Sequence, residues 1–86
     1  MESQHWFVYF VRCSDGSLYA GISTDVEQTM KTTNNGVGSV YTRSRLPVFL
    51  AHSEEYMNEI DAQNRLTSVQ RMSRAKKEYI LVAAQL

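Results

Sequence analysis

The stretch from Trp6 to Ile22 contains two apolar runs on either side of the polar segment Ser14-Asp15-Gly16. Both runs are rich in β-branched and aromatic residues, so together they predict a β-hairpin. The first run, Trp6 to Val11, has no polar interruption. Such a run is typical of a strand that is covered on both faces, and we therefore expect it to lie in the centre of its sheet.

The length of the hairpin loop decides which side chains share a face of the sheet. A two-residue turn would pair Tyr9 with Ile22 and send Tyr9 and Tyr19 to opposite faces. A three-residue loop, with Gly16 in the left-handed conformation, would pair Tyr9 with Gly21 and place both tyrosines on one face. We prefer the three-residue loop, which leaves open space above Gly21 and lets two phenols line one concave surface. The alternative interpretation is that both tyrosines are simply good strand formers.

The segment after the hairpin predicts a short amphipathic helix. Thr24 is the expected N-cap, Glu27 completes a capping box, and the helix runs to about Asn34. The stripe expected to face the hairpin consists of Val26, Thr29, Met30 and Thr33. Threonine is a mediocre helix former, so this helix depends on docking against the sheet.

The second half of the chain predicts one strand and two helices. Pro47 precedes a β-rich run, residues 48–53, which we expect beside the hairpin in an antiparallel sheet. A helix begins at Met57 or Asn58, and its buried stripe is Ala62, Leu66, Val69 and Met72. Ser73 caps a last helix, whose inward residues we predict to be Ala75, Tyr79, Val82 and Ala83. The fold class is therefore α/β, a small three-stranded antiparallel sheet flanked by helices in the order β-β-α-β-α-α, in a single domain of residues 1–86.

Composition narrows the possible functions. A single cysteine, Cys13, forms no internal disulfide, and no leader or long apolar run indicates secretion or membrane spanning, so we expect a cytoplasmic protein. Nine Lys and Arg residues balance nine Asp and Glu residues, which gives a formal net charge of zero. Proteins that grip phosphates usually carry a basic surplus, so this balance indicates weak nucleic-acid binding at most.

Two groups of residues are nonetheless candidates for nucleic-acid contact. Tyr41, Arg43 and Arg45 lie in a predicted loop, where they could hold a phosphate backbone and stack a base. Arg71 and Arg74 belong to a second basic cluster at the junction of the last two helices. Either group could equally be an ordinary solvated surface. The apolar end of the chain, EYILVAAQL, either closes the core or leaves a patch for a protein partner.

The segment Phe7-Val8-Tyr9, followed ten residues after Tyr9 by Tyr19-Ala20-Gly21, resembles the paired motif of the GIY-YIG nuclease family. The likeness is greatest to small stand-alone bacterial members and extends to the nuclease domain of the excision-repair endonuclease. It continues through SDGSLYAGISTDVE, NNGVGSVYTRSRLPV and MSRAKKE, and so covers nearly the whole chain. The resemblance implies phosphodiester hydrolysis, in which a tyrosine helps to activate water, an arginine stabilises the phosphorane and a glutamate binds one divalent metal.

Carried over residue by residue, the resemblance is incomplete. The retained residues are Tyr9, Tyr19 and Gly21. The positions of the family's arginine, histidine and glutamate hold Thr29, Thr33 and Leu66. The resemblance therefore implies a catalytically degenerate domain, without a metal, that retains weak nucleic-acid or protein binding. The alternatives are an active Mg²⁺-dependent, structure-specific DNA endonuclease with a rearranged site, and a module that only binds proteins; the oligomeric state stays open.

Overall fold

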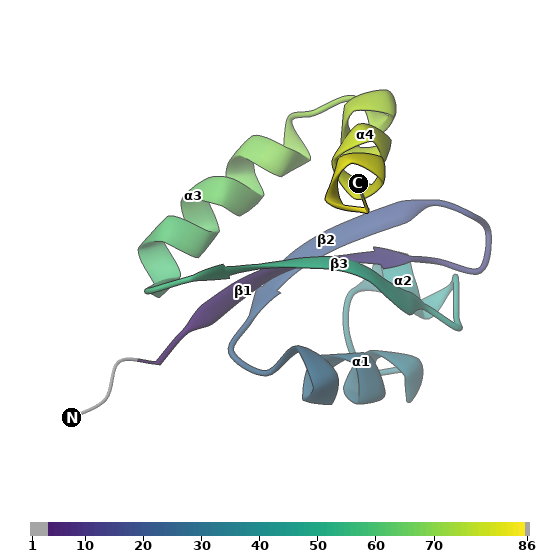
Figure 1. Ribbon diagram of the computed structural model, residues 1–86. Coiled ribbons are helices and arrows are strands. Elements are labelled where there is room, and N and C mark those ends of the chain that lie inside the picture. Colours follow the sequence, from purple (N-terminus) through teal and green to yellow (C-terminus); the bar gives the residue numbers. More distant parts are fainter. Residues whose placement is uncertain (1–3, 86) are drawn as a thin grey trace.

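A computed structural model describes residues 4–85 and shows a sheet of three strands between two layers of helices (Figure 1). The elements, in chain order, are β1 (Trp6–Arg12), β2 (Leu18–Ser23), α1 (Val26–Asn34), α2 (Val40–Arg43), β3 (Phe49–Tyr56), α3 (Glu59–Gln70) and α4 (Arg74–Ala84). The strands are antiparallel in the order β2-β1-β3, with α3 and α4 over one face and α1 and α2 over the other. The predicted fold class and the central position of the first strand are confirmed.

The hairpin has the register of the three-residue loop. Tyr9 pairs with Gly21 and Val11 pairs with Tyr19. Gly16 has φ +85°, the left-handed conformation that this loop requires and that glycine adopts without steric penalty. Side chains of a strand alternate between faces, so this register places both tyrosines on the face covered by α1 and α2.

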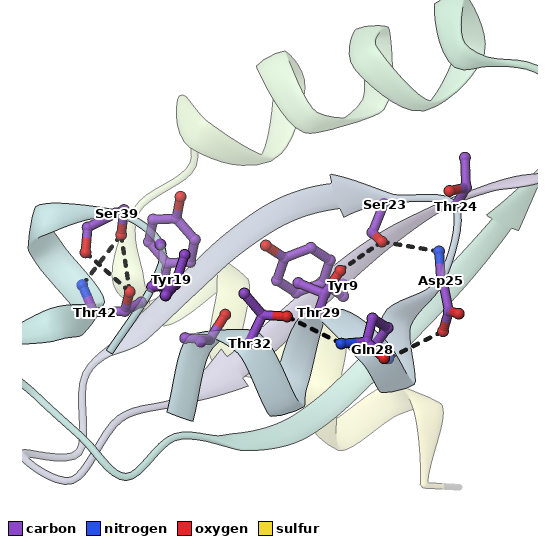
Figure 2. Close-up of a pocket in the computed structure, with 13 residues that line it drawn as sticks. Tyr9, Tyr19, Ser23, Thr24, Asp25, Gln28, Thr29, Thr32, Ser39 and Thr42 are labelled. Carbon is purple, nitrogen blue, oxygen red and sulfur yellow. Dashed lines mark hydrogen bonds between the residues drawn. The ribbon is translucent and has the colours of Figure 1, made fainter. Parts of the chain in front are cut away.

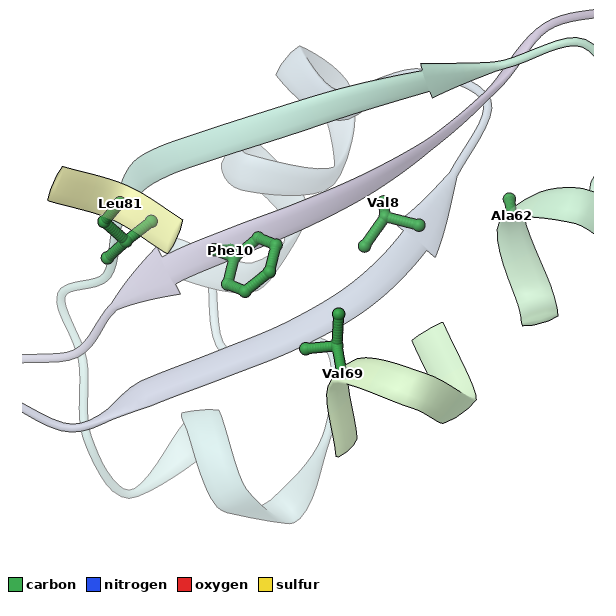
Figure 3. Close-up of a cluster of buried hydrophobic side chains, with 5 residues drawn as sticks. All are labelled: Val8, Phe10, Ala62, Val69 and Leu81. Carbon is green, nitrogen blue, oxygen red and sulfur yellow. The ribbon is translucent and has the colours of Figure 1, made fainter. Parts of the chain in front are cut away.

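The opposite face of the sheet carries the larger apolar cluster. Val8 and Phe10 from β1 pack with Ala62 and Val69 from α3 and with Leu81 from α4 (Figure 3). All five side chains are buried. The stripe predicted for α3 is therefore confirmed, including Leu66, which is also buried.

The face toward α1 holds a second cluster. Val11, Cys13 and Val48 are buried there, and the α1 residues Val26 and Met30 pack against them. This arrangement confirms the stripe predicted for α1. None of the helices in residues 4–85 has both the length and the run of apolar residues needed to cross a bilayer.

The amide side chain of Asn34 joins the end of α1 to the start of β3. Its Nδ2 donates to the carbonyl oxygen of Val48 at 3.0 Å, and its Oδ1 accepts from the Val48 N–H at 2.8 Å. Val48 is 1% exposed, so these hydrogen bonds satisfy backbone groups that have little access to water.

Four details differ from the prediction. Helix α3 begins at Glu59 rather than at Met57 or Asn58, because Asn58 is its N-cap and accepts the Asp61 N–H at 2.9 Å. The N-cap of α1 is Asp25 rather than Thr24, because the Asp25 carboxylate accepts the Gln28 N–H at 3.0 Å. The segment predicted as a continuous loop contains the one-turn helix α2, whose N-cap Ser39 accepts from the N–H of Thr42. The third strand runs Phe49–Tyr56 rather than 48–53.

The face predicted for the last helix was wrong. Ala75, Tyr79, Val82 and Ala83 are exposed, and Leu81 is the buried residue of α4. Arg12 on β1 donates to both carboxylate oxygens of Glu78, at 2.6 and 2.8 Å, and this hydrogen bonding lowers the pKa of Glu78. The helix therefore docks through a different stripe, with Leu81 in the core, Ile80 packed against it and Glu78 beside Arg12.

Candidate functional site

The two tyrosines of the hairpin and helix α1 enclose a pocket of ≈ 370 Å³ (Figure 2). Its far wall is formed by the segment that leads into α2 and by α2 itself. The lining residues are Tyr9, Tyr19, Ser23, Thr24, Asp25, Gln28, Thr29, Thr32, Thr33, Val37, Gly38, Ser39 and Thr42. The structure thus brings the sequence candidates Tyr9, Tyr19, Thr29 and Thr33 together in one site.

The ring of Tyr9 lies directly over Gly21, so the open space expected above this glycine is filled. A Cβ atom at position 21 would lie 2.5 Å from Tyr9 Oη and 2.7 Å from its Cζ, far inside van der Waals contact. Only glycine allows the ring this position. Burial, and secondarily the neighbouring Tyr19, raise the pKa of the Tyr9 phenol above its ordinary value of 10.0. Tyr9 is therefore a neutral phenol near pH 7.

Thr29, at the position where the resemblance implies an arginine, links α1 to the end of β2. Its Oγ1 lies 2.6 Å from Ser23 Oγ, and Ser23 Oγ accepts the Asp25 N–H at 2.9 Å. Because Asp25 is the N-cap of α1, these two hydrogen bonds connect Thr29 through Ser23 to the start of the helix, and they help to position α1 against the sheet. Thr33, one turn further along, is 8% exposed and faces the same pocket.

The residues of the pocket do not fit a divalent metal. Among residues 4–85, Asp25 is the one carboxylate that lines the pocket, and Oδ1 of Asp25 already accepts the Gln28 N–H. Leu66 belongs to the helix layer on the other face of the sheet and is not among the lining residues. Nowhere in residues 4–85 do three or more His, Cys, Asp or Glu side chains come together as a metal site would require.

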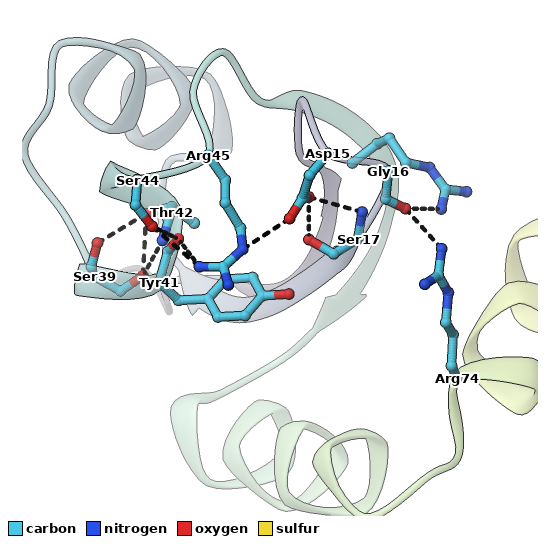
Figure 4. Close-up of polar contacts among 10 residues, drawn as sticks. Asp15, Gly16, Ser17, Ser39, Tyr41, Thr42, Ser44, Arg45 and Arg74 are labelled. Atoms are coloured by element: carbon cyan, nitrogen blue, oxygen red, sulfur yellow. Dashed lines mark hydrogen bonds and ion pairs between the residues drawn. The ribbon is translucent and has the colours of Figure 1, made fainter.

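The side chain of Arg45 is hydrogen-bonded to the loop at the tip of the hairpin (Figure 4). Its Nε donates to Asp15 Oδ2 at 2.9 Å, and its Nη1 donates to the carbonyl oxygen of Tyr41 at 2.8 Å. The guanidinium carbon lies 3.8 Å from the centroid of the Tyr41 ring, and that ring stacks on Tyr19 with centroids 5.8 Å apart. The stack Arg45-Tyr41-Tyr19 therefore connects the loop to the rim of the pocket.

The other candidate arginines differ in how far they are paired. Arg74 donates to the carbonyl oxygen of Gly16 at 3.1 Å and lies 3.8 Å from Glu78 (Figure 4). Arg43 and Arg71 are exposed, and neither forms an ion pair with any residue in the range 4–85. An arginine that already forms an ion pair or hydrogen bond within the protein must break it to bind a phosphate. Arg43 and Arg71 are therefore better placed for phosphate binding than Arg45 and Arg74.

Sequence reasoning missed a polar cluster on β3. Glu54 accepts two hydrogen bonds from Arg65, at 2.9 and 3.1 Å, one from Tyr56 Oη at 3.0 Å, and lies 3.2 Å from His52 Nε2. Burial opposes ionisation of Glu54, but the hydrogen bonds outweigh it and lower the pKa of this carboxyl below its ordinary 4.5. The spacing of residues 52, 54 and 56 would have revealed their shared face. The cluster is internally satisfied and lies outside the pocket.

Sequence reasoning also missed most of the pocket's hydroxyl groups. Nine of the thirteen lining residues carry a hydroxyl, and Ser23, Thr24, Thr32, Ser39 and Thr42 were not among the candidates. The density of Ser and Thr between positions 23 and 42 was a signal for them.

Comparison with known proteins agrees with this geometry. A family model described as the GIY-YIG catalytic domain matches residues 5–79. A UPF0213 protein of Bacillus velezensis is 40% identical over 78 residues, which cover 91% of this chain and 79% of the relative. A UPF0213 protein of Halobacterium salinarum is 42% identical over 71 residues, which cover 83% of this chain and 92% of the relative.

Solved structures extend the comparison to the fold. The solution NMR structure of the UPF0213 protein BH0048 from Bacillus halodurans matches with a TM-score of 0.61 and 34% identity, covering 92% of this chain and 84% of that one. The solution NMR structure of the protein EF2693 from E. faecalis matches with a TM-score of 0.65 and 28% identity, covering 98% and 90%.

Proposed function

Because this chain belongs to the GIY-YIG family, as its paired motif indicated, we propose that it uses the family's nuclease scaffold for binding and does not hydrolyse phosphodiesters. One observation carries the proposal. Tyr9 and Tyr19 remain in the pocket, but none of the described residues that line it is Lys, Arg or His. A pocket without a cation is poorly suited to an anionic transition state.

The chemistry of the missing charges supports this reading. Phosphodiester hydrolysis builds up negative charge on the phosphorane, and removal of one preorganised donor from such a site typically lowers the rate by about 10²–10³-fold. Thr29 offers a hydroxyl at the arginine position, and that hydroxyl is already bonded to Ser23. The raised pKa of Tyr9 also disfavours the phenolate form that would withdraw a proton from water most readily.

The metal requirement points the same way. A divalent cation such as Mg²⁺ needs oxyanion ligands, and among the described residues the pocket offers only Asp25, which caps α1. The residues present therefore do not fit a divalent metal.

The decisive experiment is a cleavage assay with purified protein on supercoiled, branched and single-stranded DNA, with Mg²⁺ or Mn²⁺. We expect no nicking above background, because neither the phosphorane nor a metal has its partner. Tyr9→Phe is the matched variant, since it removes only the phenolic hydroxyl. Metal-dependent cleavage by the parent protein that disappears in Tyr9→Phe would support the active-endonuclease alternative and would overturn the proposal.

Weak nucleic-acid binding is the role that we assign to the exposed arginines. If Arg43 and Arg71 each neutralise one phosphate, the double Ala variant should reduce the slope of log K against log salt by about 1.4 units on single-stranded DNA, about 0.7 for each phosphate. Fluorescence anisotropy with labelled single-stranded DNA measures this slope. Lys31→Ala is the matched control, because Lys31 is an exposed cation on α1 that lies 3.6 Å from Glu27. An unchanged slope in the double variant would remove these arginines from the interface.

Protein binding is the second candidate, and the outer face of α4 favours it. Tyr79 and Val82 on this helix are 69% and 57% exposed. If the parent protein shows no salt-dependent DNA binding even at low ionic strength, the nucleic-acid role fails and this candidate replaces it.

A further inference from the structure

We propose that the pocket beside Tyr9 and Tyr19 binds an uncharged ligand with a hydroxylated ring, which is either a sugar or an unphosphorylated nucleoside. This inference rests on the proposed function, because it names the ligand class for the same pocket once cleavage is lost.

The charges of the lining residues exclude ionic ligands. A phosphate or carboxylate would be desolvated in the pocket without a cationic partner, which is unfavourable. A cation would have one carboxylate, Asp25, whose Oδ1 already accepts the Gln28 N–H at 3.0 Å. An uncharged ligand does not incur the cost of burying an unpaired charge, so the lining residues favour uncharged ligands over ions.

The hydroxyl groups of the pocket suit a ligand that has several hydroxyls of its own. Each hydroxyl can both donate and accept, so it adapts to a polyhydroxylated ring. Some are occupied internally, as in the pair Ser39 and Thr42, whose side-chain oxygens are 3.0 Å apart. By contrast, within residues 4–85 the structure gives no hydrogen bond to the hydroxyls of Tyr9, Tyr19, Thr24 and Thr33. These four groups are available to a ligand.

The volume of the pocket fits a small ligand such as a sugar or a nucleoside. Its ≈ 370 Å³ lies near the lower end of the usual range for small-molecule sites, about 300–1,000 Å³. Tyr9 and Tyr19 lie side by side on the hairpin and supply aromatic surface (Figure 2). The far wall has no side chain at Gly38, where a Cβ would come within 3.7 Å of Thr33 Oγ1 and 3.6 Å of Thr42 Oγ1. The glycine thus leaves room beside the Thr33 hydroxyl.

The test compares adenosine, its 5′-monophosphate and glucose as probes at millimolar concentration, with backbone amide shifts of the parent protein as the readout. We expect adenosine, glucose or both to shift amides of the pocket, and we expect adenosine to bind at least about tenfold more tightly than its monophosphate, because only the monophosphate brings an unpaired charge. Binding by adenosine alone assigns the nucleoside, and binding by glucose alone assigns the sugar. Monophosphate affinity equal to or above that of adenosine, or no pocket shifts with either neutral probe, would overturn the inference.

Two kinds of variant link the signal to the pocket. Tyr9→Phe and Thr33→Val each remove one hydroxyl and should weaken binding of the neutral probe by about 2–12-fold, the equivalent of one net hydrogen bond. Thr67→Val is the matched control, since Thr67 is an exposed threonine of α3, on the other side of the sheet. If Tyr9→Phe and Thr33→Val bind as tightly as the control, the probe sits elsewhere.

A cation added to the pocket should reverse the preference. Thr29→Arg places a guanidinium at the site of a lining threonine, and the monophosphate should then bind more tightly than adenosine. If Thr29→Arg does not fold, Gln28→Arg makes the same test at an exposed lining position. Failure of the inference is distinct from failure of the proposed function, because a pocket that prefers the monophosphate yet does not cleave DNA refutes only the ligand class.

Discussion

Replacement of Gly21 by alanine tests the contact that shapes the pocket. The new methyl group would lie 2.5 Å from Tyr9 Oη and 2.7 Å from Cζ, whereas carbon atoms in contact are normally about 3.5–4.0 Å apart. The Tyr9 ring, which is 8% exposed, must therefore move by about 1 Å, and overpacking of this kind typically costs about 1–3 kcal/mol.

A double-mutant cycle isolates this cost from the intrinsic effect of the substitution. Tyr9→Leu removes the ring atoms that the new Cβ would meet. In that background Gly21→Ala should be stabilising by about 0.5–1 kcal/mol, because alanine loses less backbone entropy than glycine. The expected coupling between the two positions is thus about 1.5–4 kcal/mol.

Urea denaturation followed by Trp6 fluorescence measures the free energy of unfolding of the parent, the two single variants and the double variant. In a domain of this size, each kcal/mol of lost stability should lower the melting temperature by about 4–8 °C, so thermal melts provide a second measurement. Gly36→Ala is the matched control. Gly36 has a positive φ, +88°, so alanine is strained there, but no atom lies within 4 Å of its would-be Cβ, and its cost should therefore be the same in both backgrounds. If Gly21→Ala destabilises the Tyr9→Leu background as much as the parent, the close approach of the ring to Gly21 is not the cause.

Two further predictions concern stability. The folded-state pKa of Glu54 lies below its ordinary value, so the unfolded chain binds a proton at this carboxyl more readily than the folded chain. The stability that Glu54 contributes is therefore fully present above the ordinary pKa of a glutamate, and it is lost as the pH falls through the lowered folded-state pKa. Urea titrations should therefore show a flatter acid limb for Glu54→Gln than for the parent, with the exposed Glu59→Gln as control; identical limbs would contradict the assignment. Asn34→Ala should lower the free energy of unfolding by about 1–3 kcal/mol, because two backbone groups of Val48 lose their partner. The exposed Asn64→Ala should have little effect, and equal effects of the two substitutions would show that the Val48 bonds contribute no net stability.

The hairpin and two of the helices could be derived from the sequence because their signals are local. Loop length and Gly16 determine the strand register, since a shift of one residue would turn every side chain to the other face. The stripes of α1 and α3 contrast clearly with their polar faces, so their docking sides were predictable. Tyr9, Tyr19, Thr29 and Thr33 became site candidates through the family resemblance, and the structure brings all four into one pocket.

The orientation of α4 could not be derived in this way. Its apolar residues extend around much of the helix, so several stripes compete and periodicity does not choose among them. The observed stripe contains Leu81, which is buried in the core, and Glu78, which accepts from Arg12 across 66 positions of the chain. The apolar end of the chain is accordingly divided, with Leu81 buried and Tyr79 exposed.

The sequence by itself determined the strand register, the central strand and the stripes of two helices. Each of these depends on the chemistry of one residue or on spacing within one element. Only the tertiary structure decided that Arg45 is held by Asp15, that Arg65 pairs with Glu54 and that the Tyr9 ring fills the space above Gly21. These contacts join distant segments or depend on side-chain rotamers, and they exist only once packing has brought the groups within a few ångströms of one another.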